Sequence, residues 1–193
     1  MTTARGAFEV LRRFTWPFAL VGGLLVVAFS LVPWGRSDEG VRPSVSGLGR
    51  VSVPGAQPED VAFLEEHTLR PGLITVVLGA VIVLFAAIGW WQPRVRWVTL
   101  AAIAIACAVS FGTAVVVLAD PAGHLFDARV NEALDSSTPL LSPAYGPIGV
   151  LVVSVVVAAV MIVEAVDRRG RPQRRPVVAD APTEEVTPGG GSS

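Results

Sequence analysis

Four long apolar runs constrain this chain more than any other feature of its sequence. They cover residues 16–34, 73–91, 97–119 and 145–166, and their one charged residue is Glu164, near the end of the fourth run. A helix needs about 20 apolar residues to cross a bilayer. In hydrocarbon the backbone must satisfy its own hydrogen bonds, so each run should be a helix. The runs predict an all-α membrane protein, a bundle of four transmembrane helices.

Composition supports this prediction and excludes other classes. Charged residues make up 16% of the chain, whereas soluble domains carry about 25%. The net charge of −1 argues against a nucleic-acid partner, which would favour a strongly basic surface. A single Cys excludes an internal disulfide or a Cys-rich metal site. All 15 basic residues are Arg, which suggests a GC-rich bacterial genome.

The distribution of Arg predicts the orientation. Ten Arg fall in the N-terminus 1–15, the short link 92–96 and the tail 167–193, against five in the longer connections 35–72 and 120–144. The positive-inside rule therefore places both termini in the cytoplasm of a bacterium and both long loops outside its plasma membrane. A competing interpretation treats the first run as a cleavable signal peptide, with Ala28-Phe29-Ser30 as the cleavage site.

Aromatic residues and loop patterns add detail. All five Trp, together with Tyr145, stand at the ends of runs, which predicts aromatic belts at the headgroup level. In the first outer loop, Gly47–Gly55 permits a short extended segment, and a helix is expected from Pro58 to about Leu69. In the second, helical spacing of apolar residues over 122–135 predicts an amphipathic helix.

The third run has the clearest pattern for helix packing. Small residues recur four apart on one face, and a second small row ends at Gly112. Small side chains let helices approach closely in lipid, so we expect this helix at the centre of the bundle, with Ala19, Gly23, Ser154 and Ala158 as candidate partners. The predicted packing residues are Ala102, Ala106, Ser110, Gly112 and Ala114.

No pattern indicates a catalytic, cofactor or metal site. His67 and His124 lie in different loops with no compact metal spacing, and we expect both to be solvated. Cys107 is expected to be a buried, inert thiol, and Ser110 and Thr113 to bond their own helix or a neighbouring one. Glu164 and Asp167 should pair locally with the arginines that follow them. The tail should be basic and then disordered. Its predicted lipid-headgroup residues are Arg168, Arg169, Arg171, Arg174 and Arg175.

These features favour a non-catalytic accessory or scaffold protein that binds lipid, another membrane protein or itself. The alternative is a small transporter or channel subunit that acts as an oligomer. The layout resembles the small four-span orphan membrane proteins of actinobacteria, including the tryptophan-associated transmembrane family. The resemblance rests on Pro33-Trp34, Val45-Ser46-Gly47, the short Arg-containing link and the basic tail. It implies an integral membrane protein of unknown activity.

Overall fold

Four long helices form most of the protein. The computed structural model describes residues 2–37, 42–126 and 142–169. The long helices are α1 (Thr2–Leu31), α3 (Pro71–Trp91), α4 (Arg96–Ala119) and α7 (Tyr145–Arg169). Each contains a segment long and apolar enough to cross a membrane, which confirms the four predicted helices. The chain is a multi-pass membrane protein by the length and composition of these helices.

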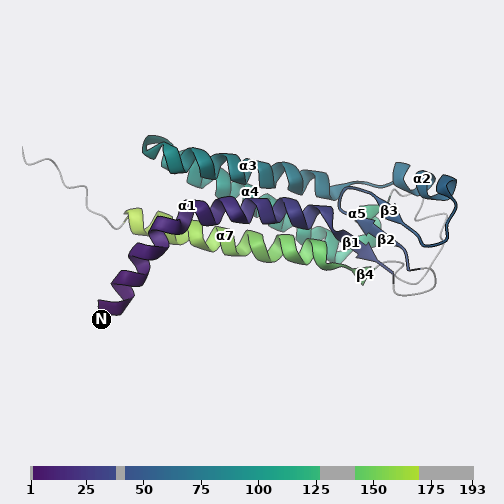
Figure 1. Cartoon of the computed structure of the whole chain (residues 1–193), viewed down its shortest axis with the longest axis horizontal. Helices are drawn as coiled ribbons and strands as arrows, with labels where there is room; N and C mark the ends of the chain where they lie inside the picture. Colours follow the sequence, from purple (N-terminus) through teal and green to yellow (C-terminus); the bar gives the residue numbers. More distant parts are fainter. Residues whose placement is uncertain (1, 38–41, 127–141, 170–193) are drawn as a thin grey trace, which may run out of the picture.

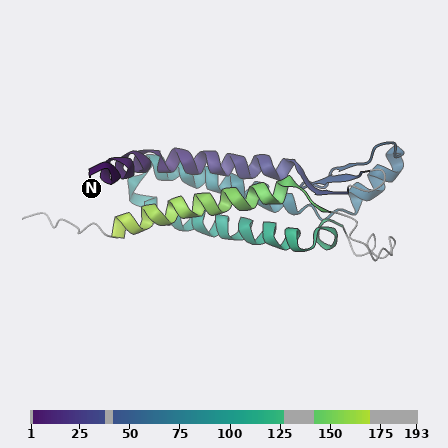
Figure 2. The same ribbon diagram turned by 90° about the horizontal axis from the view of Figure 1, so that it is seen from below.

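The four helices lie side by side, and each packs against two neighbours in the cyclic order α1–α3–α4–α7 (Figures 1 and 2). The prediction of a central third helix is wrong. That helix is α4, and it packs mainly against α3 and α7, as one of four members of the ring. A ring of four helices has no central member, because each helix turns one stripe inward and the opposite face outward.

Proline residues set several helix boundaries. Pro17 lies within α1, and Figure 1 shows the N-terminal part of this helix angled away from the bundle. The helix ends at Leu31 and not at Trp34, because Pro33 cannot continue it and instead begins a strand. Pro71 opens α3, and the link to α4 is a single 3-10 turn, η1 (Pro93–Val95). We call this end of the bundle the hairpin end.

The opposite end carries a small domain, the head, which corrects the all-α prediction. Its sheet has the order β3-β2-β1-β4, and every neighbouring pair is antiparallel. Two short helices, α2 (Pro58–Glu66) and α5 (Pro121–Leu125), complete it. The strands are β1 (Pro33–Arg36), β2 (Ser44–Ser46), β3 (Val51–Ser52) and β4 (Ser142–Pro143).

The head meets the loop predictions in part. Helix α2 begins at Pro58 as expected but ends at Glu66, three residues before the predicted end. Of the predicted extended segment, only Val51–Ser52 is a strand. The predicted helix over 122–135 lies outside the described residues beyond Phe126, and α5 ends at Leu125.

The aromatic-belt prediction fails for two of the five Trp. Trp34 is 0% exposed, and its Nε1–H donates to the carbonyl of Phe29 at 3.0 Å. It fits beside Gly47 and Gly146, where an added Cβ would lie only 2.7 and 2.6 Å from that nitrogen. Trp16 is also buried, in the core near the hairpin end. The other Trp residues and Tyr145 are exposed, as a belt requires.

Candidate functional site

The head is joined to the bundle by a close backbone contact. The N–H of Gly72, in the first turn of α3, donates to the carbonyl of Gly47 at 2.8 Å. A Cβ on Gly72 would lie 2.5–2.6 Å from the backbone of Gly47, so only glycine permits this approach. Beside it, the hydroxyls of Ser30 on α1 and Thr75 on α3 are 2.6 Å apart and both buried. The head therefore sits on the bundle in a fixed position.

Helix α2 covers one edge of the sheet. Val61 and Leu64 pack against the buried cluster that the head shares with the adjacent ends of α1, α4 and α7, and Oε1 of Glu65 accepts a hydrogen bond from the N–H of Val51 at 3.1 Å. Val51 belongs to β3, an edge strand of the sheet. Unpaired edge strands invite pairing with other chains, and the carboxylate of Glu65 occupies one of the free donors. The side of α2 that carries Val61, Leu64 and Glu65 is thus occupied by contacts within the protein.

The other face of α2 is exposed and carries an unusual combination of side chains. Phe63 is 57% exposed, and its ring lies 4.5 Å from the ring of His67. Nδ1 of His67 lies 2.9 Å from the carbonyl oxygen of Phe63, which fixes the imidazole beside the phenyl ring. Glu59, Asp60 and Glu66 are exposed around this pair. We call these five residues the α2 face.

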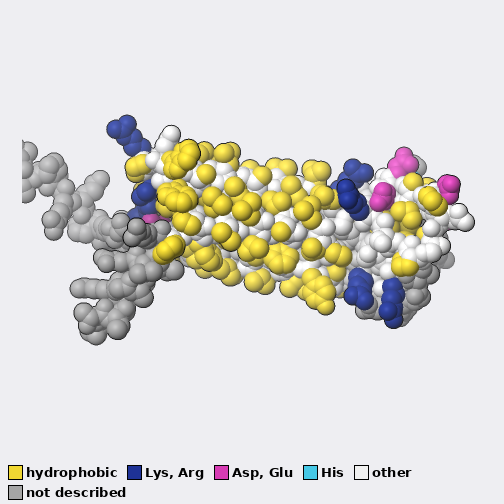
Figure 3. Space-filling view, in the orientation of Figure 1, with side chains coloured by type: hydrophobic (Ala, Val, Ile, Leu, Met, Phe, Trp, Pro, Cys, Tyr) yellow, Lys and Arg dark blue, Asp and Glu magenta, His cyan; other side chains and the backbone are white. Residues whose placement is uncertain are grey.

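Charge is separated along the head. No Arg or Lys occurs between positions 51 and 69, whereas the rest of the head carries exposed arginines, both where it meets the apolar bundle and along its lower edge in Figure 3. We call these four exposed arginines of the head the arginine collar: Arg36, Arg42, Arg50 and Arg70. Arginine next to phosphate groups is favourable, while carboxylates are repelled by an anionic surface. An anionic surface would therefore attract the arginine collar and repel the α2 face.

The predicted packing residues of α4 do not form one seam. Ala106, Ser110 and Ala114 are buried, and Ala102 is half-buried. A Cβ added at Gly112 would meet no atom within 4 Å, so this position lies in no close helix contact. Among the candidate partners, Ala19 and Ser154 are buried, but Gly23 approaches α3 and not α4. The expected hydrogen bond of Thr113 is present, to the carbonyl of Val109 at 3.0 Å.

Of the five predicted lipid-headgroup arginines, two lie within the described residues and three lie outside them. Arg168 binds the carboxylate of Glu164, four residues earlier on α7, as predicted. The guanidinium of Arg169 lies over the ring of Trp97 on α4. Arg171, Arg174 and Arg175 lie outside the described residues. From the sequence, Arg96 contributed only to the predicted orientation in the membrane. In the structure its guanidinium lies over the ring of Trp16, and its Nε–H donates to the carbonyl of Gly89.

Within residues 2–37, 42–126 and 142–169, no three His, Cys, Asp or Glu side chains are grouped to hold a metal ion. Both His rings instead face backbone carbonyls one turn earlier, His67 that of Phe63 and His124 that of Asp120. Cys107 is buried in the bundle as a free thiol, as expected.

Comparison of the chain with protein-family models, with curated proteins and with solved structures finds no match. The resemblance to the four-span actinobacterial proteins therefore stays a prediction. What the protein does has to be inferred from the chemistry of its own surfaces.

Proposed function

We propose that this is a non-catalytic accessory protein of the bacterial plasma membrane, whose head binds another membrane protein on the extracytoplasmic side. Both termini then lie in the cytoplasm. The observation that carries the proposal is the α2 face, an exposed Phe63 surrounded by carboxylates at the far end of the molecule. The bundle anchors the head, and the arginine collar keeps this face clear of the membrane surface.

Physical considerations define the partner. An aromatic side chain that packs into a pocket is a frequent centre of binding energy, and the surrounding charges set orientation and specificity. The acids of the α2 face would repel another acidic surface. The partner therefore presents an apolar pocket bordered by Arg or Lys, on a domain that extends from the same membrane.

Photo-crosslinking in living cells tests this proposal. A photoreactive amino acid at position 63 should give a discrete adduct with one membrane protein, identified by mass spectrometry. The matched control is the same amino acid at Ser142, which is also exposed in the head but on β4, at the opposite edge of the sheet. The double change Glu59→Lys and Asp60→Lys should remove the adduct at position 63, because it reverses the charge around Phe63.

The outcomes separate the alternatives. Equal adducts at positions 63 and 142, or an adduct unaffected by the two Lys substitutions, would contradict a specific docking face. An adduct of twice the mass of the protein would show that the partner is a second copy. Adducts with lipid alone would mean that the head lies on the membrane and that the collar does not hold it upright.

A transporter or channel subunit is the second candidate, and one observation favours it. The hydroxyls of Ser110 and Ser154 are buried in the bundle and have no hydrogen-bond partner among the described residues. Polar groups inside a membrane bundle often mark a substrate path. We expect this function only in a homo-oligomer, because apart from a few buried hydroxyls the core of a single four-helix ring is filled by apolar side chains. The mass of the purified protein in mild detergent tests it.

A further inference from the structure

The hairpin end of the bundle holds an arginine of α4 that contacts two other helices. Arg96 is the first residue of α4, and its guanidinium carbon lies 5.9 Å from the centre of the Trp16 ring on α1. Its Nε–H donates to the carbonyl of Gly89 on α3 at 3.1 Å. This carbonyl lies in the last turn of α3, where helix carbonyls lack partners within the helix and favour a cation. The guanidinium plane is therefore fixed, and neither terminal nitrogen has a hydrogen-bond partner among the described residues.

A second arginine reaches the same turn of α4 from another helix. Arg169 ends α7, and its guanidinium carbon lies 5.8 Å from the centre of the Trp97 ring. Trp97 directly follows Arg96, so the two Arg–Trp pairs share the first turn of α4. Stacking on an aromatic ring holds a guanidinium in place and lowers the entropy lost when it binds an anion.

Arg168 has a different role. Its guanidinium binds Glu164, a carboxylate that is only 6% exposed, and the two charges cancel locally. Together, 92–100 and 160–169 carry four Arg and two acids, Glu164 and Asp167, which leaves two positive charges in excess. Among the described arginines of this end, Arg96 and Arg169 are the pair that is oriented by stacking and not paired with Glu164.

We propose that Arg96 and Arg169 each bind phosphate groups of anionic phospholipids at the hairpin end. Guanidinium groups bind phosphate through paired N–H donors, and each of these two guanidiniums is held in place by stacking on a Trp ring. The surface beside them selects a lipid over free phosphate. Trp97, which contacts Arg169, is about half exposed and the next residue, Val98, is 65% exposed, which gives acyl chains an apolar surface near this end of α4. The site is at the opposite end of the bundle from the head, so it does not depend on the function proposed for the α2 face.

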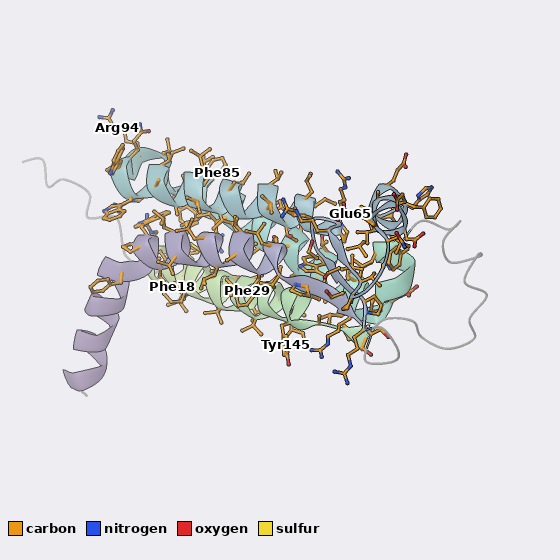
Figure 4. The ribbon with its side chains drawn as sticks, turned by 45° about the vertical axis from the view of Figure 1, so that its right-hand side comes forward. Phe18, Phe29, Glu65, Phe85, Arg94 and Tyr145 are labelled. Atoms are coloured by element: carbon orange, nitrogen blue, oxygen red, sulfur yellow. The ribbon has the colours of Figure 1, made fainter. Side chains whose placement is uncertain are left out.

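Native mass spectrometry of the full-length protein in neutral detergent tests the site. Phosphatidylglycerol should bind several-fold more tightly than phosphatidylcholine of the same chain length. Arg96→Gln and Arg169→Gln should each weaken the binding of phosphatidylglycerol roughly tenfold or more, the expected effect of losing a charged hydrogen-bond donor. Arg94→Gln is the matched control. It removes the same charge from the same hairpin, but Arg94 points away from the bundle (Figure 4), so its effect should stay within about twofold.

Three results would overturn the proposal. Equal loss in Arg94→Gln and Arg169→Gln would show diffuse charge attraction without a site. Equal affinity for the two lipids would show that the phosphate is not recognised. Displacement of the lipid by inorganic phosphate at equal concentration would assign the site to the free ion. Arg96 also joins three helices, so Arg169→Gln alone decides the test if Arg96→Gln lowers the yield of folded protein.

Discussion

At the scale of single residues, the buried hydroxyls of the bundle differ in whether they form a hydrogen bond with a neighbouring helix. Ser30 lies 2.7 Å from the carbonyl of Val26 and 2.6 Å from the hydroxyl of Thr75, so it joins α1 to α3. Ser110 and Ser154 are equally buried but have no partner among the described residues. The sequence predicted a hydrogen bond for Ser110, and this prediction is wrong. Spacing shows that a serine is on an inward stripe, but the rotation of the neighbouring helix decides whether an acceptor faces it.

We predict opposite effects for two matched substitutions. Ser30→Ala should lower the free energy of unfolding by about 1 kcal/mol, because it removes a hydrogen bond between helices. Ser154→Ala should leave it unchanged or raise it by about 1 kcal/mol, because it removes a buried hydroxyl that has no partner. Titration of the folded protein in mild detergent with a denaturing detergent measures both values. A clear destabilisation by Ser154→Ala would show that its hydroxyl is bonded.

At the scale of helices, the closest crossing joins α1 to α3. A Cβ on Gly79 would lie 2.9 Å from the carbonyl oxygen of Gly23, and a Cβ on Gly23 would lie 2.9 Å from that of Gly79. The sequence placed its small-residue seam on α4 instead. In an Ala-rich chain several helix faces carry small residues, and single-helix periodicity does not show which face meets a neighbour. The sequence correctly predicted Gly23 as a packing residue, but it predicted α4 as the partner helix, whereas Gly23 contacts α3.

Glycine-to-alanine substitutions at Gly79 and at Gly112 should change the stability of the protein in opposite directions. Gly79→Ala should destabilise the protein by about 1–3 kcal/mol, because the new Cβ meets the backbone of α1. Gly112→Ala should stabilise it by up to about 1 kcal/mol, because α4 has open space there and alanine favours the helix. Thermal unfolding of both variants in the same detergent makes the comparison. The opposite order would mean that the tight crossing is between α4 and its neighbours.

At the scale of the whole molecule, the four membrane helices and the start of α2 could be predicted, but the sheet of the head could not. Long uncharged runs determine the helices through hydrogen bonding in hydrocarbon, whatever their neighbours. The strands have two to four residues each, and β4 pairs with β1 across more than 100 residues of chain. No local periodicity reveals such a sheet. Trp34 is a second example. Its place at the end of an apolar run predicts a position at the membrane interface, and the sheet that buries it cannot be seen in the sequence.

Orientation in the membrane is the last prediction, and two matched positions test it. Gln57 in the head and Gln92 at the hairpin end are both exposed, and each can be changed to Cys in a Cys107→Ala background. An impermeant maleimide added to intact cells should label Gln57→Cys, and Gln92→Cys only after permeabilisation. The expectation rests on Arg94 and Arg96, because the positive-inside rule acts most strongly through short links beside membrane helices, whereas the collar arginines belong to a longer connection. Labelling of Gln92→Cys with protection of Gln57→Cys would reverse the orientation. The head would then face the cytoplasm, and its partner would have to be sought there.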